Sequence, residues 1–200
     1  FSAPYTLENG TLELSKDGLL DVDYNTTIAS NILVSDNSTI DIAKSVTLTT
    51  GESIDISNYK LTLRGSGTLS NTKSVLLSNT DSLLVLAGDI TIALIEVTGN
   101  SASGKGIRVE SEDAEVTTLN LAAELRLTFT DNSYVLDVGE LNINSAAQLT
   151  GEGEDGLLVV TNLLQEDDSY VLTLHDINIK VENEIEVTFE NQIIITGHTA

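Results

Sequence analysis

Apolar and polar residues alternate along this chain in short runs that recur from one end to the other. Examples are Thr11–Leu14 (TLEL), residues 53–56 (SIDI) and residues 60–64 (KLTLR), and the pattern returns at residues 140–143 and 184–187. Because successive side chains of a β-strand point to opposite faces of a sheet, each run predicts a short strand with one buried face. We therefore expect an all-β protein.

The distance between these runs predicts how the strands are arranged. Three successive runs always cover 18 to 23 residues, counted between the first buried aliphatic residues Leu12, Leu20, Ile28, Ile32, Ile40, Val46, Ile54, Leu61, Leu69, Val75, Leu84 and Ile90. One coil of this length cannot bury its inner face alone and must stack on the next. The spacing therefore predicts a parallel β-helix, or solenoid, with about three short strands per coil.

An antiparallel β-sandwich is the alternative, because it also contains many short strands at regular spacing. The solenoid is favoured because the strand spacing is short, aromatic residues make up only 4% of the chain, and Trp and Cys are absent. We expect one all-β domain over residues 1–200. Regular coils are predicted at 1–98, and a less regular acidic part or cap at 99–200, where the period loosens.

Charge and composition exclude several classes of function. The 31 acidic and 9 basic residues give a net charge of −22, which repels phosphate backbones, so no nucleic acid is expected as a partner. Without Cys, and with His175 and His198 as the two histidines, one chain has no thiolate or three-histidine metal site. The apolar runs are strand-sized, so no membrane span is predicted.

The first residue bears on where the protein works. The chain contains no Met and begins with Phe1. Removal of a secretion signal is the commonest way for a chain to lose its N-terminal segment. We expect an extracellular or cell-surface location after removal of a leader, and an excised fragment is the alternative.

The succession of strand patterns at residues 45–50, 54–57 and 61–69 resembles the passenger regions of bacterial autotransporters and other β-solenoid extracellular surface proteins. The resemblance covers residues 7–98 and consists of composition and period rather than of a motif. It implies a class, exported surface proteins, and no catalytic residue.

Acidic residues are concentrated in the second half of the chain. From residue 127 onward the chain contains 14 acidic side chains and a single basic one, Lys180. Calcium prefers carboxylate and carbonyl oxygens near glycine turns. The sequence therefore predicts calcium as the one candidate cofactor, and a solvated acidic loop is the alternative; the candidate ligands are Glu152, Glu154, Asp155, Glu166, Asp167 and Asp168.

Two further motifs lie in predicted turns. Asn9, Asn25 and Asn37 each begin an N-glycosylation sequon. The spacing from Gly99 through Gly104 to Lys105 is that of a phosphate-binding loop, but Gly replaces the expected Ser or Thr and a strand pattern follows in place of a helix. We expect a glycine-rich corner there.

Both ends of the chain are apolar, which is unusual for free tails. The candidate assembly residues are Phe1, Tyr5, Phe189, Ile193, Ile194 and Ile195. Exposed strand edges invite pairing with another chain. The sequence thus predicts a non-enzymatic structural subunit of an extracellular filament, pilus-like fibre or surface layer, which self-associates into a homopolymer through terminal strands or end-to-end stacking of coils. The alternative is an adhesin or carbohydrate-binding module with a surface glycan as partner, and a minor alternative is a polysaccharide-degrading enzyme.

Overall fold

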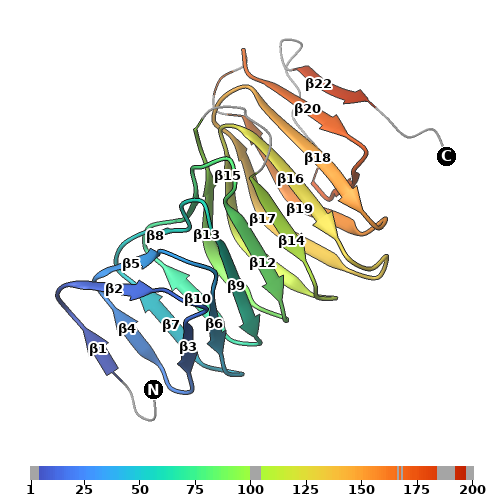
Figure 1. Cartoon of the computed structure of the whole chain (residues 1–200). Coiled ribbons are helices and arrows are strands. Elements are labelled where there is room, and N and C mark those ends of the chain that lie inside the picture. The colour runs from blue at the N-terminus through green and yellow to red at the C-terminus, as the bar shows by residue number, and fades with distance from the viewer. Residues whose placement is uncertain (1–4, 100–104, 166, 168, 184–191, 197–200) are drawn as a thin grey trace.

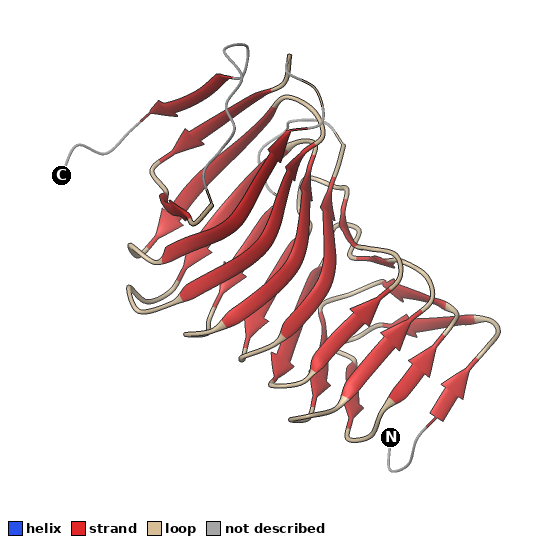
Figure 2. Cartoon of the chain, turned by 180° about the vertical axis from the view of Figure 1, so that it is seen from behind, coloured by secondary structure: helices blue, strands red, loops and turns tan. Residues whose placement is uncertain are grey.

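The chain winds into a parallel β-solenoid whose coils stack along one axis (Figure 1). The structure is a computed structural model, and it describes residues 5–99, 105–165, 167, 169–183 and 192–196. Within these residues every strand pair is parallel and no helix occurs (Figure 2). The predicted solenoid is confirmed, and the antiparallel sandwich is excluded.

In the first half each coil contains three strands, as the sequence predicts. The first strands of successive coils form one face of a 13-stranded sheet, here sheet A: β1 (Tyr5–Leu7), β4 (Thr26–Ile28), β7 (Thr47–Thr50) and β10 (Thr68–Asn71). The second strands form another face of sheet A: β2 (Thr11–Leu14), β5 (Asn31–Val34), β8 (Ile54–Asp55) and β11 (Val75–Leu77). The third strands begin a nine-stranded sheet, sheet B: β3 (Leu19–Val22), β6 (Ser38–Ile42), β9 (Lys60–Gly65) and β12 (Leu83–Ala87).

In the second half each coil contains two strands, and most of these are longer than the strands of the first half. Sheet A continues as β13 (Thr91–Val97), β15 (Ala114–Leu121), β17 (Val135–Ile143), β19 (Leu157–Gln165) and β21 (Asn178–Val181). Sheet B continues as β14 (Gly106–Val109), β16 (Glu124–Phe129), β18 (Ala147–Gly153), β20 (Val171–His175) and β22 (Gln192–Thr196). Parallel stacking therefore extends through the acidic second half, and β1 and β22 lie at opposite ends of the rod (Figure 1).

The change from three strands to two takes place at β13. This strand pairs with β10 at its start, where Thr91 faces Thr68, and with β11 at its end, where Ile95 faces Val75. Asn71, which is 7% exposed, lies where β10 ends. Its Nδ2 donates to the carbonyl oxygen of Leu94 at 2.7 Å, and its Oδ1 accepts from the Leu94 N–H at 3.1 Å. The amide thus satisfies the polar groups of β13 that face the corner between β10 and β11.

The core is a set of aliphatic rows that run along the axis. Inward positions such as Ile32 and Ile54 face each other across adjacent coils and are almost fully buried. The sequence separation of paired residues gives the length of a coil. Thr11 pairs with Asn31 and Leu157 with Asn178, within the predicted range, whereas Ala147 pairs with Leu172. The coil length thus slightly exceeds the predicted range at some pairs of the second half and falls back within it at the last strands.

Candidate assembly ends and surface groove

The N-terminal end of the described solenoid is an open coil. Among the described strands, β1, β2 and β3 each pair with one neighbour only, namely β4, β5 and β6. Leu7 and Leu12 are half-buried against the core, and Leu19 is 56% exposed. Of the predicted assembly residues here, Tyr5 lies in β1 and its backbone pairs with Thr26, whereas Phe1 lies outside the described residues.

The C-terminal end of the part that the structure describes is open in the same way. There β21 pairs only with β19, and β22 pairs only with β20. The predicted assembly residues Ile193, Ile194 and Ile195 lie in β22, the last strand of sheet B. Phe189 lies outside the described residues. The prediction that these residues mediate assembly remains a prediction, but the structure places four of the six on end strands.

The first group of predicted calcium ligands lies on β18 and in the loop that follows it. The carboxylate of Glu152 on β18 forms an ion pair with Arg126 at 3.2 Å. Glu154 and Asp155 follow β18 in an exposed loop, where the Asp155 N–H donates to Oδ1 of Asn132 at 2.9 Å. This bond joins two successive coils, so the acidic loop has a structural role.

The second group lies in the loop between β19 and β20. The carboxylate of Asp167 accepts hydrogen bonds from the hydroxyl and the N–H of Ser169, which lower the pKa of Asp167. Glu166 and Asp168 lie outside the described residues. Among the residues that are described, no three His, Cys, Asp or Glu side chains gather closely enough to hold a metal ion. Calcium binding therefore stays a prediction.

Two of the three sequon asparagines also join neighbouring coils. The Oδ1 atom of Asn25 accepts from the Thr47 N–H at 2.9 Å, and that of Asn37 accepts from the Lys60 N–H at 3.0 Å. Asn9, Asn25 and Asn37 are all exposed. A glycan would attach to Nδ2, so these Oδ1 contacts leave the acceptor nitrogen available for the predicted modification.

Lys105 is a residue whose setting the sequence does not reveal. It is 1% exposed and is followed directly by strand β14, as the alternation at residues 107–110 predicts. Burial lowers the pKa of Lys105, and the nearby carboxylate of Glu124 raises it. A buried lysine before a strand differs from a phosphate loop, in which the lysine precedes a helix and reaches out to the ligand.

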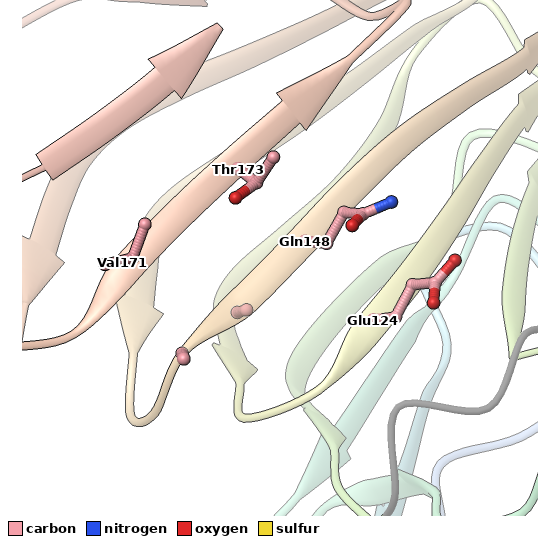
Figure 3. A pocket seen from close by; sticks show the side chains of 6 residues that line it. Glu124, Gln148, Val171 and Thr173 are labelled. Atoms are coloured by element: carbon pink, nitrogen blue, oxygen red, sulfur yellow. The ribbon is translucent and has the colours of Figure 1, made fainter. Parts of the chain in front are cut away.

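The outer face of sheet B carries a shallow groove of about 290 Å³. Figure 3 shows Glu124, Gln148 and Thr173 on three adjacent strands, with Val171 beside them. Glu124 on β16 faces Gln148 on β18, and Gln148 faces Thr173 on β20, so the three form one row across the strands. The six lining residues are Glu124, Ala146, Ala147, Gln148, Val171 and Thr173.

A second polar row lies beside the groove, two positions further along the same strands. It contains Arg126, Thr150 and His175, which face one another in the ladder. Nε2 of Gln148 donates to Oγ1 of Thr150 at 3.0 Å and so links the two rows. Gln148 is one full coil away in sequence from both Glu124 and Thr173, so no local motif announces the groove and only the register assembles it.

Comparisons with known proteins find no relative of this chain. No protein-family model, no curated protein and no solved structure matches the chain. A helix able to cross a membrane is not found in the described part of the chain.

Proposed function

We propose that this chain is a structural subunit of an extracellular filament or surface layer, and that its copies assemble by stacking coils end to end. The observation that carries the proposal is that both ends of the described solenoid present strands paired on one side only. Such an edge offers a row of unpaired N–H and C=O groups and is a template for another strand. A second copy supplies the same parallel geometry that already joins the coils.

The two ends differ in cross-section, and the chain itself contains a contact between these two kinds of coil. One end has three-strand coils (β1 to β3) and the other has two-strand coils (β21 and β22). Inside the molecule, the three-strand coil that contains β10 and β11 stacks on the two-strand coil that begins with β13. A head-to-tail junction between copies would bring the same two kinds of coil together in the reverse order, with the two-strand coil of one copy before the three-strand coil of the next.

The surface location belongs to the proposal and is supported by the sequence. Residues 7–98 resemble the passenger regions of autotransporters and similar surface proteins, and within this segment residues 7–87 form regular three-strand coils. A structural rod needs no catalytic group, because it acts by extending a filament and by contacting its neighbours.

A proline at the open edge tests the stacking. The Leu14 carbonyl accepts from the Ser35 N–H at 2.9 Å, and alternate residues of a parallel strand bond to the same neighbour, so the Glu13 N–H faces the open edge. Glu13→Pro removes this donor and leaves the Leu14 contact with the adjacent coil in place. We expect wild-type protein to form high-mass species at high concentration with calcium present, and Glu13→Pro to sediment as a monomer.

Glu13→Ala is the matched control, since it loses the same carboxylate, which accepts from Oγ of Ser35, but keeps the edge N–H. We expect Glu13→Ala to assemble like the wild type in sedimentation velocity. A wild-type protein that stays monomeric, or a Glu13→Pro variant that assembles as well as Glu13→Ala, would contradict end-to-end stacking.

A further inference from the structure

We propose that the groove on sheet B, lined by Glu124, Ala146, Ala147, Gln148, Val171 and Thr173, binds a neutral glycan chain that lies across the strands. The inference goes beyond assembly, because the groove is on the side of the solenoid and is complete within one chain. The ligand class follows from the hydrogen-bonding groups, the shape and the charge of this surface.

The row of polar side chains offers both donors and acceptors. The Glu124 carboxylate accepts, the Gln148 amide does both, and the Thr173 hydroxyl does both. All three are half-buried on neighbouring strands, so the ladder sets the spacing between them. Sugar hydroxyls also donate and accept, and a row of such groups fits a ligand that carries hydroxyls along its length.

The shape of the groove favours a linear ligand. Its polar row crosses β16, β18 and β20, so the polar groups repeat about every 4.8 Å along the solenoid axis. Ala146 is exposed and has a short side chain that lets a ring approach the sheet, whereas the side chain of Ala147 is buried in the core. Val171 adds an apolar wall for the C–H face of a sugar. An extended glycan can place successive sugars over successive strands.

The charge around the groove favours a neutral ligand over an anionic one. The nearest cation in the second row, Arg126, is paired with the Glu152 carboxylate at 3.2 Å. The groove itself contains the Glu124 carboxylate, which lies near the buried Lys105, and the whole chain has a net charge of −22. An acidic polysaccharide would therefore be repelled.

The groove is suited to holding a glycan rather than cleaving it. Glycoside hydrolysis commonly uses two carboxyl groups that flank the scissile bond. Glu124 is the one carboxylate among the six lining residues. The adjoining row contributes an arginine, a threonine and a histidine.

Calorimetric titration with neutral hexasaccharides tests the proposal. The probes are cellohexaose, laminarihexaose and mannohexaose, with polygalacturonate as the anionic counterpart. We expect at least one neutral probe to bind the wild type, and Gln148→Glu or Thr173→Ala to weaken that binding by about tenfold through the loss of one hydrogen bond. Gln148→Glu keeps the side-chain size and places a second carboxylate beside Glu124.

Thr62→Ala is the matched control, because Thr62 is also a half-buried outward threonine of sheet B but lies on β9, away from the groove. It should bind like the wild type, and all variants should keep the far-UV circular dichroism of a β-protein. No binding of any neutral probe, binding of polygalacturonate alone, or an equal loss in Thr62→Ala and Thr173→Ala would overturn the proposal. None of these outcomes bears on the proposed end-to-end assembly, because that proposal is tested at Glu13, which is not part of the groove.

Discussion

The stacking of coils places side chains of like charge next to each other on neighbouring strands. Asp137 on β17 faces Glu115 on β15 in an outward row of sheet A, and Lys180 lies two strands further along this row, beyond Val159. Partial burial, followed by the carboxylates of Asp113, Glu115 and Glu182, raises the pKa of Asp137, and Lys180 acts in the opposite direction. The folded state therefore binds a proton at Asp137 more tightly than the unfolded chain does.

This shift predicts how stability depends on pH. With a raised folded pKa, the contribution of Asp137 is most favourable below its unfolded pKa of about 3.9 and is lost as the pH rises through the folded pKa. Asp137→Asn removes this loss. We expect the variant to exceed the wild type by about 0.2–1 kcal/mol in unfolding free energy at pH 7, and the two to converge below about pH 4. Urea denaturation at a series of pH values measures both.

Asp131→Asn is the control with the opposite sign. Hydrogen bonds from the N–H and the hydroxyl of Ser133 lower the pKa of Asp131. Its stabilising contribution is therefore present above the unfolded pKa and is lost as the pH falls through the folded pKa. If Asp137→Asn were less stable than the wild type at pH 7, the row of carboxylates would not be repulsive in solution.

At the scale of elements, tight corners let one coil lie directly on the next. Gly65 ends β9 with a φ of +95°, and a Cβ there would collide with the carbonyl oxygen of Ile42 in the preceding coil. Gly10 also has a positive φ, of +101°, but a Cβ there would meet no atom within 4 Å. A side chain at Gly10 would therefore meet backbone strain alone, whereas one at Gly65 would meet both backbone strain and a clash with the adjacent coil.

Substitution of these two glycines measures the closeness of the coils. Gly10→Ala should cost about 1–2 kcal/mol from the unfavourable φ alone. Gly65→Ala should cost about 1–3 kcal/mol more, because the Ile42 carbonyl must move and the β6–β9 ladder with it. Thermal and urea unfolding of both variants give the difference, and equal losses would mean that the corner at Gly65 has room to relax.

The strands could be predicted from the sequence because their inward residues alternate with outward ones, as at Leu61 and Leu63. The merging of β10 and β11 into β13 could not, since residues 91–97 alone give no sign that one strand faces two. The groove was missed for a related reason. Glu124 and Gln148 meet through the register between successive coils, which depends on loop lengths rather than on local pattern.

At the scale of the whole molecule, charge and stacking act against each other. Copies that each carry a net charge of −22 repel at long range, and this repulsion is screened within about 8 Å at physiological ionic strength. Contacts between end strands depend on backbone hydrogen bonds and apolar burial, which salt does not weaken in this way. Assembly is therefore expected to strengthen as salt is raised.

The central claim is that copies continue the solenoid from one molecule into the next. The described part of sheet B has nine strands, so stacked copies of these coils should repeat about every 43 Å along the fibre axis. The strands should run perpendicular to that axis and lie about 4.8 Å apart. Electron microscopy of the concentrated protein at physiological salt with calcium measures this directly. Unbranched fibres with these two spacings are the predicted result, and monodisperse particles, or fibres with strands parallel to the axis, would contradict it.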